Sequence, residues 1–345
     1  MDKLFKKLRI TRVIEETHDV KTFELESEGE NISYLAGQYL TFVFTRNGQE
    51  IRRSYSLASS PVLQEPLAIT VKRVQNGTVS RPLFDHAKAG DTLITTGPGG
   101  FFVLPDVLMH DQQLFFMAAG SGIVPVFSLI KTVLYLYPGL PVILIYSSRS
   151  EKDAIYYNEL KALEARNSKS LRIEFLFSLS ADLMKARLNQ TLLQILLQQY
   201  SRATRENILF YTCGPFPYMR MIEIELQTIG FSASQIRKEQ FNTIRPPVKI
   251  LPPDTDAHEV EIRINEKKHL LKVQYPQTIL EAAKKNGISL PYSCEVGKCG
   301  NCVATCLHGQ VWMMYNEVLL NDETRKGLVL TCSGFPVGGD VILQF

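Results

Sequence analysis

The sequence lacks the long apolar runs by which export signals and membrane spans are identified. Four Lys and Arg residues within 3–9 interrupt any run that could form the core of a signal peptide. The most apolar window, 114–130, is broken by two glycines and a proline, so it favours strand, turn and helix over a membrane span. We therefore expect a cytoplasmic protein without membrane association.

Net charge is nearly absent as well. The 38 Lys and Arg residues almost balance the 35 Asp and Glu residues, and a formal charge of +3 is too small to indicate a nucleic-acid partner. A length of 345 residues predicts two or three domains. The hydrophobic fraction of 45% is typical of globular packing rather than disorder, and no internal repeat is visible.

Cysteine is scarce, but four of the six cysteines lie within 294–306. In a reducing compartment, clustered cysteines indicate metal binding or redox chemistry more often than disulfides. Cys294, Cys299 and Cys302 have the spacing C-x4-C-x2-C, and Cys332 follows after 29 further residues. This is the spacing of plant-type two-iron, two-sulfur clusters.

The loop between these cysteines must curl around a cluster to present three thiolates. Gly297 and Gly300 permit that curl and let backbone N–H groups approach the sulfurs. A structural zinc site is the alternative, although such sites usually show two close pairs of ligands. We interpret Cys306 as a buried small hydrophobic residue rather than a fifth ligand.

Three segments with different patterns follow one another. Short β-branched runs and turns over 8–105 predict an antiparallel β-barrel, whereas alternating strands and helices over 110–240 predict an α/β domain with a parallel sheet. Four prolines within 244–258 indicate an extended linker. The remainder predicts a small α+β unit, in which Thr278 and Glu281 form a capping box at a helix start. The expected domains are 1–106, 107–243 and 258–345, with the linker at 244–257.

The barrel segment contains a pattern suited to a flavin. In "RRSYSLAS", Arg53 and Tyr55 share one face of a strand, and Ser54 and Ser56 share the other. An Arg fork suits a phosphate, and an aromatic ring can lie against a flavin. An ordinary alternating surface strand is the alternative.

A second pattern in this segment suits an anion. Gly77 predicts a turn, and Thr78 or Ser80 could cap a short helix whose free N–H groups face a phosphate. The alternative is an ordinary capped helix.

The middle segment contains two turns suited to a dinucleotide. Gly120, Gly122 and Pro125 lie where an apolar strand passes into a helix, so the backbone could approach a pyrophosphate there. Residues 213–215, Cys-Gly-Pro, end another strand. Each turn also has a purely structural alternative. Residues 120–125 could form an ordinary strand-turn-helix connection, and Cys213 could be a buried strand residue.

The choice of coenzyme depends on residues after the second strand of this segment. Ser147, Ser148 and Arg149 offer hydrogen bonds and positive charge to a 2′-phosphate, so we expect NADPH, with NADH as the alternative. The alternative is that Arg149 forms an ion pair with Glu151 or Asp153, in which case its charge would not be available to a 2′-phosphate.

These motifs together resemble the ferredoxin–NADP reductase superfamily, followed by a plant-type ferredoxin domain of β-grasp fold. The likeness is nearest to oxygenase reductases of the phenylacetyl-CoA epoxidase type. It implies FAD rather than FMN, an outer iron on Cys294 and Cys299, and an inner iron on Cys302 and Cys332. It further implies that Ser56 and Cys213 lie at the reaction centre, near the flavin N5 and the nicotinamide. The other residues implied at the cofactors are Arg53, Ser54, Tyr55, Val71, Lys72, Arg73, Gly77, Thr78, Val79, Ser80, Gly214, Pro215 and Phe241.

The resemblance implies a reductase that passes electrons from NAD(P)H through FAD and a 2Fe-2S cluster, singly, to an iron oxygenase or hydroxylase, of the kind that oxidises aromatic or aryl-CoA compounds. Two alternatives remain open. One is a self-contained flavoreductase acting on a small acceptor. The other is a redox-sensing or zinc-stabilised binding module.

Overall fold

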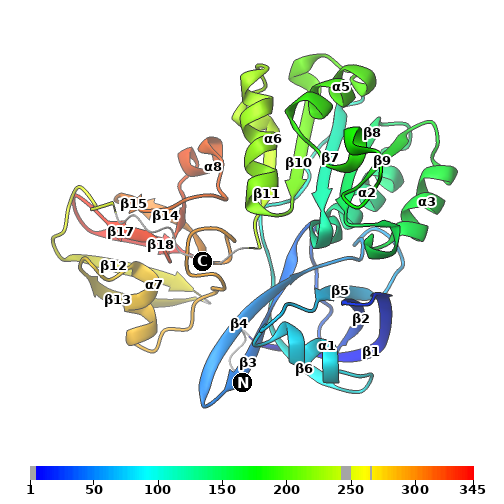
Figure 1. Ribbon diagram of the computed structural model, residues 1–345. Helices are drawn as coiled ribbons and strands as arrows, with labels where there is room; N and C mark the ends of the chain where they lie inside the picture. Colours follow the sequence, from blue (N-terminus) through cyan, green and yellow to red (C-terminus); the bar gives the residue numbers. More distant parts are fainter. Residues whose placement is uncertain (1–4, 242–249, 265) are drawn as a thin grey trace. The chain divides into compact units, whose positions relative to one another are not determined.

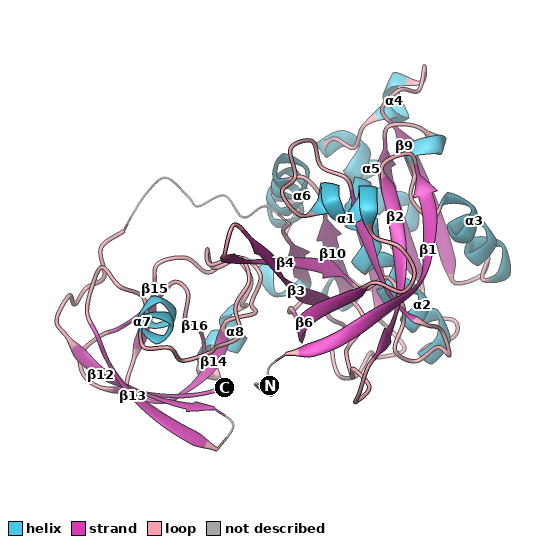
Figure 2. Ribbon diagram, turned by 90° about the horizontal axis from the view of Figure 1, so that it is seen from below, coloured by secondary structure: helices cyan, strands magenta, loops and turns pink. Residues whose placement is uncertain are grey.

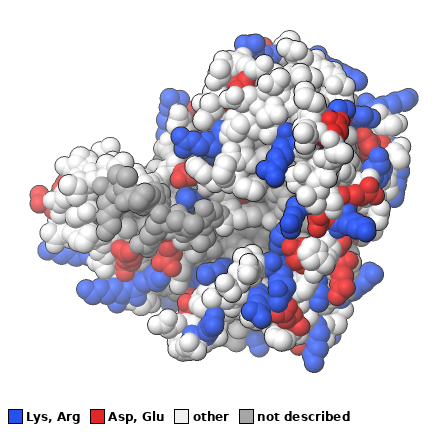
Figure 3. All heavy atoms as spheres, in the orientation of Figure 1, with Lys and Arg blue, Asp and Glu red and all other residues white. Residues whose placement is uncertain are grey.

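The computed structural model describes residues 5–241, 250–264 and 266–345, which belong to two compact units. The larger unit comprises 5–98 and 102–240, and the smaller comprises 99–101 and the residues from 241 onward. None of the helices within the described ranges combines the length and hydropathy needed to cross a membrane. Charges of both signs are interspersed on the face drawn in Figure 3, as the small net charge leads one to expect.

The first half of the larger unit is the predicted antiparallel barrel. Its strand order is β4-β3-β6-β1-β2-β5, and an antiparallel bridge from Leu57 to Ile69 links the two outer strands β4 and β5. Alternate strand residues such as Phe23, Leu40 and Phe42 are fully buried in its core. The elements are β1 (Lys6–Thr17), β2 (Val20–Ser27), β3 (Tyr39–Arg46), β4 (Gln49–Ser56), β5 (Leu67–Lys72), α1 (Ser80–His86) and β6 (Thr92–Gly99).

The second half is the predicted parallel sheet, with strand order β11-β10-β7-β8-β9. The chain leaves β7 toward β8 on one side and reaches β10 on the other, so the topological switch point lies between β7 and β10. The strands are β7 (Gln113–Ala119), β8 (Val142–Ser148), β9 (Leu171–Phe177), β10 (Ile208–Cys213) and β11 (Ile236–Glu239). The helices are η1 (Gly120–Gly122), α2 (Ile123–Leu136), η2 (Glu151–Asp153), α3 (Tyr157–Arg166), α4 (Leu183–Ala186), α5 (Gln190–Tyr200), η3 (Arg205–Asn207), α6 (Phe216–Thr228) and η4 (Ala233–Gln235).

Strand periodicity distributes the apolar side chains to both faces of this sheet. Leu114 and Phe116 pack in the core shared with α2 and α3, whereas Phe115 and Met117 pack with α5 and α6 on the opposite face (Figure 1). The first of these cores also includes barrel residues such as Ala68. A few barrel residues therefore pack against the parallel sheet, beside the barrel's own core.

The smaller unit has a sheet of order β13-β12-β18-β14-β16. The outer part of this sheet is antiparallel, but β12 pairs in parallel with β18, the last strand of the chain. Helix α7 covers one face through Ile279, Leu280 and Ala283, as in the predicted α+β unit (Figure 2). The elements are β12 (His258–Ile264), β13 (Lys267–Val273), α7 (Ile279–Lys285), β14 (Val303–His308), β15 (Val311–Met313), α8 (Asn321–Arg325), β16 (Leu328–Leu330), β17 (Gly334–Pro336) and β18 (Val341–Gln344).

The start of α7 has the capping box expected from the sequence. The Thr278 hydroxyl accepts from the Glu281 N–H at 3.2 Å, and the Glu281 carboxylate accepts from the Thr278 N–H at 3.0 Å. The predicted linker falls partly on 244–249, outside the described residues, and 250–257 forms no helix or strand.

The cap makes a measurable contribution to the smaller unit. We expect Thr278→Ala to lower its free energy of unfolding by about 1 kcal/mol, because the Glu281 N–H loses its acceptor at the helix start. Trp312 is the sole tryptophan and lies in β15, so its fluorescence in urea reports this unit. Thr278→Ser retains the hydroxyl and should behave as wild type; equal losses in both variants would contradict a role for the cap.

Candidate active site

Two turns that are distant in sequence touch at the switch point between β7 and β10. A Cβ atom built on Gly122 would lie 2.0 Å from the carbonyl oxygen of Cys213, and one built on Gly214 would lie 2.9 Å from Cβ of Ala119. No side chain fits in either place. The structure thus brings together the predicted turns 120–125 and 213–215.

The helix that starts at this contact has an end suited to an anion. Gly122 is the N-cap residue of α2 and makes no side-chain cap bond, and Pro125 occupies the first turn, where its missing N–H is no loss. Gly120 has a φ of +55°, which favours glycine. The N–H of Ile123 donates to the carbonyls of Gly120 and Ser121, and the dipole of this 14-residue helix suits a pyrophosphate at the turn that precedes it.

Three buried polar side chains meet beside these turns. Ser56 Oγ, at the end of β4, donates to Glu239 Oε2 at 3.4 Å, and Glu239 lies opposite Cys213 in the pairing of β11 with β10. Ser56 is 5% exposed, Cys213 0% and Glu239 8%. The barrel and the nucleotide-type sheet both contribute to this cluster.

Burial sets the protonation of this cluster. It raises the pKa of Glu239 to about 8 and the pKa of Cys213 well above its usual range. Glu239 is therefore largely a neutral acid, and Cys213 a thiol, near pH 7. Glu239 was not predicted from the sequence, where its only signal is an acidic residue at the end of a short strand, two residues before Phe241. The Phe241 side chain is 48% exposed.

The predicted flavin residues lie in order along β4. Ser54 Oγ lies 2.9 Å from Thr41 Oγ1 on β3, and the exposed Arg53 guanidinium donates to the carbonyl of Arg52 at 2.7 Å. The Tyr55 ring is half-buried, and burial raises its pKa, so it remains a neutral phenol.

The three predicted flavin residues at the end of β5 differ in their burial and in their contacts. Val71 is fully buried, and Lys72 Nζ lies 3.3 Å from an Asp19 oxygen. Arg73, just after β5, makes a bidentate contact with Asp85 at 2.8 and 3.2 Å. The Arg73 guanidinium is therefore occupied by a carboxylate in this structure.

The turn after β5 is tight, but one prediction for it is wrong. A Cβ on Gly77 would lie 2.3 Å from Ser80 Oγ and 3.0 Å from the carbonyl oxygen of Val74, so the turn is closely packed around this glycine. The N-cap of α1 is Val79, with no side-chain cap bond, rather than Thr78 or Ser80. The reason is that Ser80 already lies inside the helix and its hydroxyl accepts from the N–H of Val74 at 3.3 Å.

A groove of about 700 Å³ lies between this turn and the β3–β4 hairpin. Its size is that of a small-molecule site. Of the predicted residues it includes the turn 77–79, and it adds apolar and cationic residues that the sequence did not single out. The lining residues are Phe44, Thr45, Arg46, Ile51, Asn76, Gly77, Thr78, Val79, Arg81, Pro82, Leu83 and Ala87.

The four predicted iron ligands converge in the smaller unit. The side chains of Cys299 and Cys332 both hydrogen-bond to Cys294, and Cys302 hydrogen-bonds to Cys332. These contacts lower the pKa of Cys294 and raise the pKa values of Cys299 and Cys332. Cys302 and Cys332 are buried, whereas Cys294 and Cys299 are partly exposed.

Backbone N–H groups also point at these sulfurs. Gly297 donates to Cys332 Sγ at 3.3 Å, Val296 to Cys294 Sγ and Asn301 to Cys299 Sγ, each at 3.5 Å. Such donors stabilise thiolates and suit the negative charge of an iron–sulfur cluster. Within the described ranges, no group of three or more His, Cys, Asp or Glu side chains is arranged to hold a single metal ion. A two-iron cluster does not need such a group, because each of its irons takes only two of the four thiolates.

The curl of this loop depends on its glycines. Gly297 and Gly300 have φ values of +72° and +79°, and a Cβ on Gly297 would lie 2.4 Å from the carbonyl oxygen of Tyr315. Cys306 lies on β14 as expected, but it is half-buried rather than buried, and its Sγ donates to the carbonyl of His308 at 3.3 Å.

Ser148 and Arg149 lie at the end of β8, beside the turn at Gly120. Their backbone carbonyls accept from the N–H groups of 178 and 179, which fixes the segment. In the described part of the chain no ion pair joins Arg149 to Glu151 or Asp153. Asp153 instead accepts from Ser150 at 2.5 Å.

Three family models match consecutive parts of the chain: the barrel, the domain with the parallel sheet, and the smaller unit that contains the clustered cysteines. The oxidoreductase FAD-binding domain matches residues 7–104, the oxidoreductase NAD-binding domain matches 116–223, and the 2Fe-2S iron-sulfur cluster binding domain matches 262–337.

Curated relatives match along almost the whole chain. The ferredoxin reductase component of 3-ketosteroid-9-alpha-monooxygenase from Rhodococcus rhodochrous is 33% identical, over 98% of this chain and 96% of the relative. A 1,2-phenylacetyl-CoA epoxidase subunit from Escherichia coli is 30% identical, over 99% of this chain and 98% of the relative. Among solved structures, phthalate dioxygenase reductase has the same fold, with a TM-score of 0.61, 22% identity, and coverage of 99% of this chain and 98% of that one.

The contact at the switch point allows a direct test. We expect Gly122→Ala to lower the free energy of unfolding by about 1 to 3 kcal/mol, because the added methyl group must displace the Cys213 carbonyl. Urea unfolding followed by far-UV circular dichroism measures this. Gly29→Ala is the matched control, because nothing lies within 4 Å of its Cβ position. A neutral Gly122→Ala variant would contradict the close approach.

Glu239 gives the larger unit a pH dependence of defined sign. The folded chain keeps the Glu239 proton up to about pH 8, whereas an unfolded Glu loses it near its ordinary pKa of 4.5. The folded state binds more protons in this window, so the free energy of unfolding falls as pH rises. We expect Glu239→Gln to flatten this slope in urea titrations across the window. Glu206→Gln, at an exposed site, should leave the slope unchanged; the same slope in Glu239→Gln and wild type would refute the assignment.

Proposed function

We propose a function from the premise that the chain belongs to the family of oxygenase reductase components with FAD-binding, NAD-binding and 2Fe-2S domains. The chain is an oxidoreductase of the ferredoxin reductase type. It takes a hydride from NAD(P)H and delivers electrons one at a time to the iron centre of an oxygenase. The observation that carries this proposal is the contact of Gly122 with Cys213, beside the buried Ser56 and Glu239.

The coenzyme is held at the switch point. The backbone at Gly120 and Gly122 binds the pyrophosphate, because it lies at the positive end of the α2 dipole and carries no side chain that would keep the ligand away. Cys213, Gly214 and Pro215 border the nicotinamide. The buried thiol of Cys213 offers an uncharged, water-poor wall there.

The flavin is held by the barrel. Arg53 and Ser80 bind its phosphates, Tyr55 lies against the ring system, and Ser56 lies at the reacting edge with its hydroxyl bonded to Glu239. The backbone of Val71 and Lys72 runs along the cofactor, with Ser54 behind it on β4. The groove lined by 77–79, Phe44 and Arg46 has room for the adenosine half, which supports FAD over FMN. We assign Phe241 to the flavin from the family resemblance alone.

The iron–sulfur cluster is held by the smaller unit. Cys294 and Cys299 bind the outer iron, and the buried Cys302 and Cys332 bind the inner iron. The N–H donors at Val296, Gly297 and Asn301 stabilise the sulfur charge. When bound, FAD accepts the two electrons of a hydride together and a 2Fe-2S cluster passes them on singly, which matches an iron oxygenase as acceptor.

We further propose NADPH as the preferred coenzyme. Among the described residues, Arg149 has no carboxylate partner at Glu151 or Asp153, and it lies with Ser148 beside the pyrophosphate turn, where a 2′-phosphate extends. The free thiols support a reducing compartment such as the cytoplasm. The domain limits that fit this function are 1–106 for FAD, 107–243 for NAD(P) and 258–345 for the cluster, with 244–257 as the linker.

An anaerobic absorbance titration with NADPH, and separately with NADH, tests the function. We expect bleaching of the flavin band followed by the iron–sulfur band, with about two irons per chain. Cys332→Ser should lose the iron and keep the flavin bleaching. Cys306→Ser is the control and should keep about two irons.

Each other outcome has a distinct meaning. Full turnover with a small acceptor, with no gain on adding an oxygenase component, would favour a self-contained flavoreductase. A colourless protein containing zinc would contradict the proposal.

A further inference from the structure

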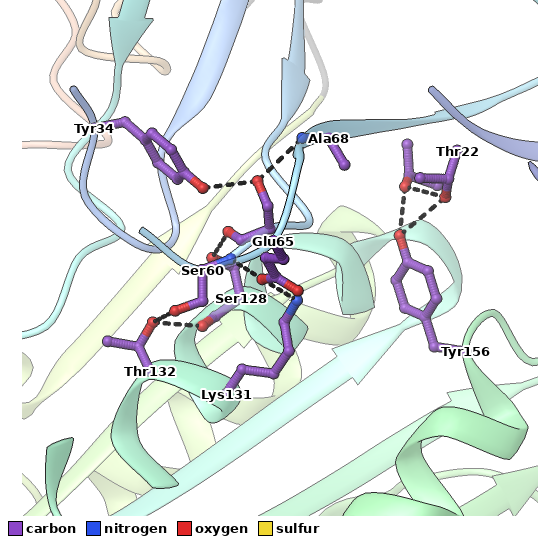
Figure 4. Close-up of polar contacts among 11 residues, drawn as sticks. Thr22, Tyr34, Ser60, Glu65, Ala68, Ser128, Lys131, Thr132 and Tyr156 are labelled. Carbon is purple, nitrogen blue, oxygen red and sulfur yellow. Dashed lines mark hydrogen bonds and ion pairs between the residues drawn. The ribbon is translucent and has the colours of Figure 1, made fainter. Parts of the chain in front are cut away.

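The segment that follows β4 is hydrogen-bonded to the middle of α2. Ser128 Oγ donates to the Ser59 carbonyl at 2.6 Å, and the hydroxyls of Ser60 and Thr132 lie 2.6 Å apart (Figure 4). These four residues are at most 5% exposed. Water therefore does not compete for these bonds, which define one geometry between barrel and helix.

An ion pair reinforces the same contact. Lys131 Nζ on α2 lies 2.6 Å from Glu65 Oε1, and this carboxylate also accepts from the N–H of Ser60. The Lys131 side chain is 12% exposed, and breaking such a pair leaves a poorly solvated charge. Lys131 Nζ lies 4.6 Å from the centre of the Phe127 ring.

The contact continues to a second anchor on the barrel. Phe127 stacks on Tyr156 at 4.5 Å between ring centroids, and the buried Tyr156 hydroxyl bonds to Thr22 and Thr70 on β2 and β5 (Figure 4). Tyr156 has a φ of +60°, which non-glycine residues adopt only where their surroundings hold them. The helix α2 is thus fastened to the barrel at two places.

We propose that this network, the domain clamp of Ser59, Ser60, Glu65, Ser128, Lys131, Thr132 and Tyr156, positions the coenzyme-binding start of α2 against the flavin strand β4. The proposal rests on the function above. Its members are positioning residues, because none of them belongs to the candidate active site.

The geometry of the two elements explains how the clamp would act. Ser56 ends β4 only three residues before Ser59, and α2 starts at Ile123, five residues before Ser128. Five residues are about 8 Å of helix, which is too short to bend appreciably. Fixing the middle of α2 therefore fixes the turn that holds the pyrophosphate, and with it the distance over which a hydride moves. Reacting atoms must approach to about 3.5 Å, so small displacements matter.

The double variant Ser128→Ala/Thr132→Val tests the clamp, since it removes two hydroxyls and changes little volume. Thr132→Ser retains the hydroxyl and is the conservative control. Asn189→Ala is the stability control, because it removes the N-cap of α5, which packs on the opposite face of the sheet. If the double variant folds poorly, the single variant Ser128→Ala replaces it in both measurements.

Two measurements on the full, FAD-loaded chain are needed. In stopped flow with saturating NADPH or NADH, we expect the rate constant of flavin bleaching to fall about tenfold or more in the double variant, with coenzyme Kd changed less than about twofold. Amide hydrogen exchange should become faster in α2 and in residues 57–66 of the double variant without coenzyme. Thr132→Ser should match wild type in both.

The outcomes separate the clamp from the proposed function. If neither coenzyme reduces wild type, the proposed function fails, and hydrogen exchange alone decides the clamp. If wild type is reduced but the double variant matches it, the clamp is refuted. An equal fall in Asn189→Ala, or unchanged exchange in α2, refutes it also.

Discussion

The larger unit depends on one steric contact, the approach of Gly122 to the carbonyl of Cys213. Because no Cβ fits there, the turn after β7 and the end of β10 lie in van der Waals contact. The start of α2 then adjoins the end of β10, where Cys213 is paired with Glu239 of β11. A larger residue at 122 would separate the turn at 120–122 from the buried polar cluster that contains Ser56.

The burial that this contact creates also sets the chemistry. Ser56, Cys213 and Glu239 have almost no access to water, so their uncharged forms are favoured and the Ser56–Glu239 bond needs no ionised partner. A neutral wall suits transfer of a hydride, since the site then holds no fixed charge that must be solvated when water is excluded from it.

Much of this could be predicted from the sequence, because the signals are local. Strand alternation, the capping box at Thr278 and the cysteine spacing depend on neighbours in the chain, and the fold classes of all three domains are confirmed. Glu239 could not be predicted, because its role arises from partners on β4 and β10. The predicted N-cap of α1 was wrong for a related reason. The Ser80 hydroxyl accepts from the N–H of Val74, and this bond depends on the conformation of the whole turn. The groove beside Phe44 and the clamp on α2 likewise join segments far apart in sequence.

The two units meet different geometric requirements, and in both of them buried packing and hydrogen bonds fix the positions of the functional groups. Hydride transfer requires two ligands at contact distance. In the larger unit, barrel residues such as Ala68 pack in a core of the parallel sheet, and buried polar bonds such as Ser128 to Ser59 join the two parts. The smaller unit has its own core, and it needs only a loop that keeps four thiols together. There the Gly297 N–H donates to Cys332 Sγ and so joins the loop of the cysteine triplet to the fourth cysteine, which is distant in sequence. A side chain at 297 would strike the carbonyl of Tyr315, so the same glycine that donates this bond also permits the turn that aims it.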